Sequence, residues 1–354
     1  MEIKQNIKQN LHLVVGGVAA GLALTLPRRS NWRLPLTTVA TLELGQGLLK
    51  KYKPSPSAAP SEIDDVAAPE NSYSGVVDGI NMRWEEHGDN STGSIPVVMV
   101  HGIPTHPRLW RYIIPKVARP GIQCFAWELV GFGWSMEEGL HRDISVAKQA
   151  EYLYSWLQHK GITRAVFVGH DLGGGVLQQL LTHHPELCAG LTLVDCIAYK
   201  NWPVTLVRLA RSMNAVIDKI PAPLLKPVLL AGFMNLGHDS AQRRWNSFEL
   251  HWQPYARSVG PKAFAHQLRN LNSDDTAAVA DQLPNIQAPA HVVWGDADPL
   301  GMSSAEKLAT ALHAPLTRIP NGRHFTPEDH PKEVATAINA VLGQVKIIAS
   351  DSPR

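Results

Sequence analysis

One short run of residues, G-H-D-L-G-G at 169–174, has the types and spacing needed to hold a reactive carboxylate. It follows a β-prone apolar run at 165–168 and leads into a helix-prone run at 172–182. A strand, a turn and a helix in this order form an elbow that presents one side chain, and only small residues can flank that side chain. Asp171 occupies the presented position. We interpret it as a nucleophile, against the alternative that it only caps the helix.

An aspartate at this position predicts a particular chemistry. Its ordinary pKa of about 4 makes it a carboxylate at neutral pH, so it needs no base before it attacks. Carboxylates are poor nucleophiles toward amides, but they can displace a leaving group or open a strained ring at a saturated carbon. The product would be an alkyl ester of Asp171, which water must cleave in a second step. That second step requires a base and donors for the developing oxyanion.

His324, in N-G-R-H-F at 321–325, is the candidate base. An elbow nucleophile, an acid and a histidine follow one another along the chain in that order, and His324 satisfies this order. The competing interpretation is a loop histidine that lies there by chance, since the chain contains 16 histidines.

Three aspartates compete to orient the imidazole and stabilise its charge. Asp298, in V-W-G-D-A-D-P at 293–299, follows a buried strand and is the favoured candidate. Asp195, after the apolar run at 191–194, is the main alternative, and Asp296 is the least favoured.

The motif H-G-I-P at 101–104 follows an apolar run that predicts a strand. We expect the backbone N–H groups of Ile103 and Leu172 to converge on the oxyanion. Losing one such donor typically lowers a rate about 100- to 1000-fold.

Strands and helices that alternate along the chain must position these residues. The run 73–86 predicts a hairpin that turns at Asp78-Gly79, and the run 108–117 predicts a helix. Further apolar strands alternate with helices, which indicates a mainly parallel sheet with helices on both faces.

This alternation stops between residues 198 and 285, which are helix-prone and rich in Trp, Leu, Ala and Arg. The segment is too long for a connecting loop. We therefore expect an α/β core formed by residues 71–197 and 286–348, with a helical cap, or lid, inserted at 198–285.

Residues 1–70 have a different character. Two apolar stretches at 11–26 and 34–49 are bordered by basic residues, and a Pro-rich linker follows at 54–70. The first stretch is shorter than the roughly 20 residues of a spanning helix. We expect residues 1–53 to contact a membrane surface as an interfacial helix or hairpin, with a packed extension or a cleaved secretory signal as alternatives. The sequence thus predicts a cytoplasmic protein, membrane-associated through this extension.

The composition restricts the partners. A net charge of +2 gives no broad basic surface for nucleic acid. Three scattered cysteines in apolar runs predict buried free thiols rather than a disulfide framework or a zinc site. We expect no cofactor and no metal, and only a small apolar substrate and water as reactants.

Four motifs in this order resemble the α/β-hydrolase superfamily, and within it the branch of epoxide hydrolases and haloalkane dehalogenases. They are H-G-I-P-T…L-W-R at 101–111, G-F-G-W-S at 131–135, G-H-D-L-G-G at 169–174 and G-R-H-F-T-P-E at 322–328. The resemblance covers about residues 73–344. It implies an α/β-hydrolase fold with a helical cap and an aspartate nucleophile.

The resemblance also bears on the leaving group. Haloalkane dehalogenases usually hold the halide with a Trp beside the nucleophile and often with an Asn in the H-G-x-P turn, where this chain has Leu172 and Ile103. Neither side chain can donate a hydrogen bond, which weighs against a dehalogenase. Epoxide hydrolases instead protonate the ring oxygen with cap tyrosines. Tyr199 and Tyr255 fall in or near the cap, but the second tyrosine position of that family holds Leu268.

We therefore predict an epoxide hydrolase that acts on an apolar substrate, with Tyr255 as the candidate proton donor. A packed cap aromatic is an equal interpretation of Tyr255. The alternatives for the whole chain are a haloalkane or haloacid dehalogenase and a non-catalytic, hydrolase-fold ligand-binding protein.

Overall fold

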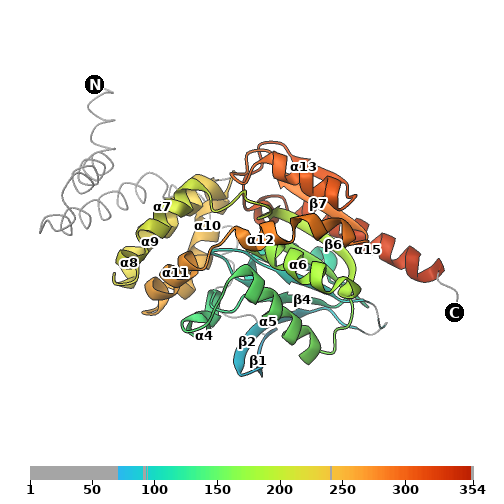
Figure 1. The fold of residues 1–354 in the computed structure, drawn as a ribbon, viewed down its shortest axis with the longest axis horizontal. Helices are drawn as coiled ribbons and strands as arrows, with labels where there is room; N and C mark the ends of the chain where they lie inside the picture. The colour runs from blue at the N-terminus through green and yellow to red at the C-terminus, as the bar shows by residue number, and fades with distance from the viewer. Residues whose placement is uncertain (1–70, 91–92, 94, 240, 352–354) are drawn as a thin grey trace, which may run out of the picture.

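The core of the protein is a single eight-stranded sheet (Figure 1). The computed structural model describes residues 71–90, 93, 95–239 and 241–351. The strand order is β1-β2-β4-β3-β5-β6-β7-β8. Their bounds are β1 Ser72–Val77, β2 Ile80–His87, β3 Val97–Val100, β4 Cys124–Trp127, β5 Ala165–Asp171, β6 Cys188–Cys196, β7 Ala290–Gly295 and β8 Leu316–Ile319.

The sheet is antiparallel only at its N-terminal edge. β1 and β2 form a hairpin in which Val77 pairs with Ile80, and β2 runs antiparallel to β4. All other neighbours are parallel. The expected hairpin is confirmed, with positive φ angles at both Asp78 and Gly79, which lets two residues close the turn. The expected mainly parallel sheet is also confirmed.

Helices cover both faces of this sheet. On one face, α5, α6 and α13 pack together with the strands, and α3 and α15 pack on the other (Figure 1). Their bounds are α3 Ile114–Val117, α5 Val146–His159, α6 Leu172–His183, α13 Met302–Ala311 and α15 Pro331–Asp351. Because both faces are covered, every residue of β3, β4, β5 and β6 is buried. This explains why these strands read as continuous apolar runs rather than alternating ones.

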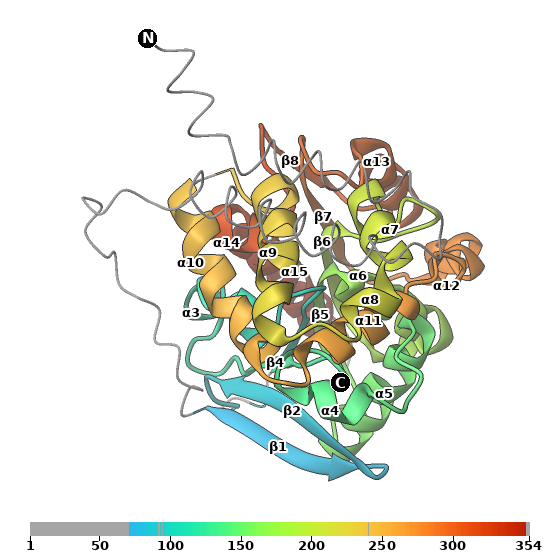
Figure 2. The same cartoon turned by 90° about the vertical axis from the view of Figure 1, so that its left-hand side faces the viewer.

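A helical segment lies between β6 and β7, and we call residues 198–285 the helical insertion. It contains α7 Thr205–Ser212, α8 Asn214–Ile217, α9 Ala222–Gly232, α10 Ala241–Trp252, α11 Gly260–Arg269 and α12 Asp274–Ala278, with shorter helical turns between them. Figure 2 shows α7, α8, α9 and α10 facing the viewer, beside the sheet. The helix-prone character that the sequence shows here is thus realised as helices.

One predicted element was wrong. Residues 108–117 do not form one helix but a 3₁₀ turn, η1 Pro107–Trp110, and the separate four-residue α3. Pro115 explains the break, since it lacks the N–H that would bond to the carbonyl of Arg111 and its ring would collide with that carbonyl. Proline is tolerated in the first turn of α3, where it lies.

The expectations for residues 1–70, including the membrane-surface contact of residues 1–53, lie outside the described residues. Within the part of the chain that the structure describes, no helix is both long enough and apolar enough to cross a bilayer.

Candidate active site

Asp171 lies at the elbow between β5 and α6. Its backbone has φ 48° and ψ −119°, a conformation that costs energy in a residue with a side chain. The turn brings α6 so close to β3 that a Cβ atom on Gly173 would lie 2.1 Å from the carbonyl oxygen of Val100. Glycine is required here by close approach of two backbones.

We expect Gly173→Ala to destabilise the fold, because backbone cannot move aside as a flexible side chain can. Overpacking of this kind typically costs about 1–3 kcal/mol, which chemical denaturation would measure. Gly343→Ala in α15 is the matched control, since its Cβ would meet nothing within 4 Å and alanine is the better helix former. An equal effect of the two substitutions would contradict the close approach.

The carboxylate of Asp171 is held in a defined orientation. Its Oδ2 accepts a hydrogen bond of 2.9 Å from the backbone N–H of Ile103. Gly102 makes this approach possible, because a Cβ there would lie 2.5 Å from the same oxygen. Burial raises the pKa of Asp171, and this shift is opposed by His324 and by the N–H groups of Ile103 and Leu172. The carboxylate is therefore less readily ionised than an unperturbed aspartate, which the sequence did not predict.

His324 lies between Asp171 and Asp298. Its Nδ1 lies 2.7 Å from Oδ2 of Asp298, and its Nε2 lies 3.8 Å from Oδ1 of Asp171. The bond to Asp298 fixes the ring so that Nε2 faces the carboxylate of Asp171. The two oxygens of Asp171 thus differ, since Oδ2 faces backbone donors and Oδ1 faces the imidazole.

Charge around His324 favours its protonated form. Burial lowers the pKa of His324, but the charge and hydrogen bond of Asp298, followed by Asp171 and Asp195, raise it to about 9. The free protein therefore holds an imidazolium here at neutral pH.

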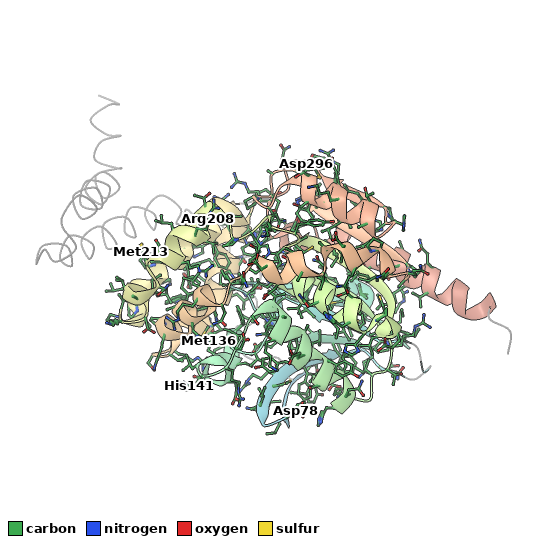
Figure 3. All side chains as sticks on the ribbon, viewed as in Figure 1. Asp78, Met136, His141, Arg208, Met213 and Asp296 are labelled. Atoms are coloured by element: carbon green, nitrogen blue, oxygen red, sulfur yellow. The ribbon has the colours of Figure 1, made fainter. Side chains whose placement is uncertain are left out.

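The structure separates the three candidate acids. Asp298 is buried in the loop after β7 and is the aspartate in hydrogen-bond contact with His324. The carboxyl group of Asp195 lies near the His324 ring, but its Oδ1 accepts a hydrogen bond of 2.8 Å from the N–H of Gly295. Burial, with Asp298 next, raises the pKa of Asp195 well above its ordinary value. Asp296 instead pairs with Arg318 at 3.0 Å and lies at the surface (Figure 3).

Two groups around His324 were missed by sequence reasoning. The Nε2 of His170 lies 2.8 Å from the carbonyl oxygen of His324, and the two rings lie 4.9 Å apart. Burial lowers the pKa of His170 well below its ordinary value, so this ring is neutral and donates to the carbonyl. The histidine beside the elbow aspartate in the sequence was the available signal.

Glu328 is the second missed group, and it ties the His324 loop to the helical insertion. It is buried in α14 Thr326–Asp329 and accepts hydrogen bonds from Arg111 and from Ser247 of α10. His251, also in α10, lies 3.2 Å away. Burial raises the pKa of Glu328, but the charges of Arg111 and His251 outweigh this effect, and the pKa lies well below its ordinary value. Glu328 is therefore a charge held by several partners.

Asp171 and His324 are the only ionisable side chains that line a cavity of about 410 Å³ among the described residues. The cavity is bounded by loops at the ends of the parallel strands and by α7 and α9 of the insertion. Trp202 lines it too, but its indole N–H donates to Thr276 at 2.7 Å. The cavity walls are therefore apolar except where Asp171 and His324 face the cavity.

The structure does not bring the candidate proton donor to this cavity. Tyr255 is fully buried in the insertion, its hydroxyl donates to Oε1 of Gln267 at 2.9 Å, and it is not among the cavity residues. Tyr199 is not among them either, whereas Leu268 is. The geometry thus favours the interpretation of Tyr255 as a packed aromatic.

The cysteines behave as the sequence predicts. Cys124, Cys188 and Cys196 are buried free thiols. Among the residues that the structure describes, no group of three or more His, Cys, Asp or Glu side chains could hold a metal ion.

Comparison with known proteins agrees with this architecture. A model of the alpha/beta hydrolase fold family matches residues 95–331. A haloalkane dehalogenase of Mycobacterium marinum is 25% identical over 275 residues, covering 74% of this chain and 90% of that protein. Bifunctional epoxide hydrolase 2 of Rattus norvegicus is 28% identical over 185 residues, covering 52% of this chain and 31% of that protein. The structure of an alpha/beta hydrolase fold protein from Burkholderia ambifaria superposes with a TM-score of 0.68 at 22% identity, covering 77% of this chain and 98% of that one.

Proposed function

Because the chain belongs to the α/β-hydrolase fold family, we propose that it hydrolyses an apolar epoxide through a covalent alkyl ester on Asp171. The observation that carries this proposal is the placement of Asp171, which lies between the Ile103 N–H and the His324 imidazole in an apolar cavity. We further propose that the helical insertion at 198–285 acts as the cap that closes this cavity over the core at 71–197 and 286–348.

In the first step, Oδ1 of Asp171 attacks a ring carbon of the epoxide, forming a carbon–oxygen bond as the ring carbon–oxygen bond breaks. The ring oxygen leaves as an alkoxide and needs a proton. His324 supplies it from Nε2, since it is the one cationic acid among the described cavity residues and its pKa is raised to about 9. The products are a hydroxyalkyl ester of Asp171 and a neutral imidazole.

In the second step, neutral His324 takes a proton from water as the water attacks Cγ of the ester. The developing oxyanion is Oδ2, which lies 2.9 Å from the Ile103 nitrogen, with the Leu172 N–H as the second donor. Collapse releases the diol, which takes the remaining carboxyl proton. Asp171 is again a carboxylate and His324 an imidazolium, so protons balance over the cycle.

A dehalogenase is the second candidate, because a haloalkane dehalogenase is similar to this chain over 90% of its own length. A leaving halide in a dry cavity needs donors, however. Leu172 and Ile103 offer no side-chain donor, and the Trp202 indole is already bonded to Thr276. An epoxide needs only the proton of His324, which favours it.

The covalent ester tests the proposal directly. Neutral His324 is required for ester hydrolysis, and Asp298 still favours the imidazolium once Asp171 is esterified, so the ester should accumulate at neutral pH. Rapid acid quenching of a single turnover with a long-chain terminal epoxide should give a chain whose intact mass exceeds that of the free protein by the mass of one epoxide. Absence of this adduct together with absence of diol would contradict the proposal.

The pH profile separates the two leaving groups. Turnover of the epoxide should give a kcat/KM that falls as pH rises through about 9, because His324 loses the proton that it must donate. A terminal bromide of the same chain length needs no proton, so any reaction with it should show no such fall. Faster release of bromide than of diol across the pH range would favour the dehalogenase instead.

A further inference from the structure

The outer surface of the insertion carries an apolar face that the proposed reaction does not explain. Five large hydrophobic side chains are exposed among the described residues, and three of them lie in one segment: Leu209 in α7, Met213 between the two helices and Val216 in α8. Leu209 lies four residues before Met213, which joins the two helices, and Val216 lies three residues after it. We call these three residues the α7–α8 face.

This face continues into the cavity. Leu209 is 58% exposed and Met213 is 37% exposed, yet both also line the cavity that contains Asp171. A side chain that contacts both solvent and cavity lies at the mouth. α7 accordingly has no buried residue, although Leu206 and Val207 are apolar and line the same space. The cavity therefore opens through an apolar rim rather than a polar one.

Basic residues flank the rim. Residues 204–234 contain the cations Arg208, Arg211, Lys219 and Lys226 and one acid, Asp218, although Lys226 is paired with Glu249 of α10 at 2.9 Å. Arg208 is exposed beside Leu209, and Figure 3 shows Arg208 and Met213 at the outer end of the insertion. An apolar strip with basic neighbours is complementary to a lipid interface, where acyl chains lie below anionic headgroups.

We propose that the α7–α8 face docks on an anionic phospholipid bilayer, so that an apolar substrate moves from the membrane into the cavity without crossing water. A protein partner or second copy seated on this face would cover the mouth, whereas a fluid bilayer both covers the apolar rim and holds apolar substrates. This inference goes beyond the proposed function, since docking requires no turnover.

A reporter on the face itself distinguishes docking here from binding by residues 1–70. The full chain carrying Met213→Cys is labelled with the fluorophore NBD; the native cysteines are buried and remain unlabelled. With vesicles of phosphatidylcholine and phosphatidylglycerol, the emission should shift to the blue and be quenched by spin labels in the acyl chains. The same label at Val76→Cys, on exposed β1, should show neither change.

Every outcome of this experiment decides the proposal. If the chain cosediments with vesicles but the label at position 213 is not quenched, another segment binds the lipid and the proposal is overturned. A blue shift that grows with protein concentration in the absence of vesicles would assign the face to a second copy instead. If quenching is as strong on pure phosphatidylcholine as on the anionic mixture, the basic residues do not contribute to docking and the preference for an anionic bilayer is wrong.

Val216→Glu supplies an independent test, because Val216 is 48% exposed but does not line the cavity. In the chain labelled at position 213, placing a charge at a lipid-facing position should raise the lipid concentration needed for half of the blue shift about tenfold or more, while kcat/KM for a short, water-soluble epoxide stays unchanged. Val76→Glu is the matched control and should leave vesicle binding intact. An equal blue shift and equal acyl-chain quenching of the label at position 213 with and without Val216→Glu would overturn the proposal, even if the ester on Asp171 is found.

Discussion

Asp171→Asn is expected to abolish turnover, with a loss on the order of 10⁵- to 10⁶-fold, as found when a covalent nucleophile is removed. The amide keeps the size of the side chain and can accept the Ile103 N–H, but it cannot form the ester. Steady-state diol formation measures the loss. Binding of an apolar ligand in the cavity should persist, because the walls are unchanged.

The control for this variant is its stability. Asn tolerates positive φ better than most residues, so the strained elbow at φ 48° should survive and thermal unfolding should be nearly unchanged. Unimpaired diol formation by Asp171→Asn would contradict the nucleophile. If the unmodified chain binds apolar ligands but turns over no epoxide or halide, the non-catalytic alternative holds instead.

Asp298→Asn should lower kcat by about 10⁴-fold, the cost seen when an acid that orients a catalytic histidine is replaced by its amide. Asp195→Asn should cost much less, because Oδ1 of Asp195 accepts a hydrogen bond from the N–H of Gly295, whereas Asp298 is the aspartate that bonds to His324. The two variants are matched, since both replace a buried carboxyl near the same ring. A larger loss from Asp195→Asn would reverse the assignment.

The pH profile adds a readout that a loss of stability would not produce. Asp298 is the largest of the influences that raise the pKa of His324. Its replacement should therefore move the alkaline limb of kcat/KM from about pH 9 toward lower pH. An unmoved limb would show that Asp298 does not set the charge on His324.

Features that depend on neighbours in sequence could be predicted from the sequence. The hairpin at Asp78-Gly79 and the elbow at Asp171 are both local, since a few residues of special backbone freedom set each turn. The buried parallel strands were also predictable, because a strand covered on both faces has a continuous apolar run in the sequence. Pro115 was a local signal too, and the predicted helix at 108–117 failed because that signal was overlooked.

Features that depend on packing between distant segments could not be predicted. Asp195 and Asp298 both follow strands, and only the position of the His324 ring distinguishes them. Tyr255 looked like a candidate donor until its hydroxyl was found bonded to Gln267 inside the insertion. The cavity and its mouth are lined by residues of α7 and α9. The distance between these two helices cannot be read from the hydrophobic periodicity of either one.

The near absence of polar groups in the cavity wall also bears on how a reaction cycle would end. An epoxide presents one ether oxygen to the wall, whereas a diol presents two hydroxyl groups that both need partners. Each unpaired hydroxyl costs about 1–3 kcal/mol in an apolar site, and Asp171 and His324 are the only ionisable side chains at the described cavity surface that could pair with them. The cavity would therefore bind the diol more weakly than the epoxide. We expect weak inhibition by the diol and a turnover rate that is not limited by diol release.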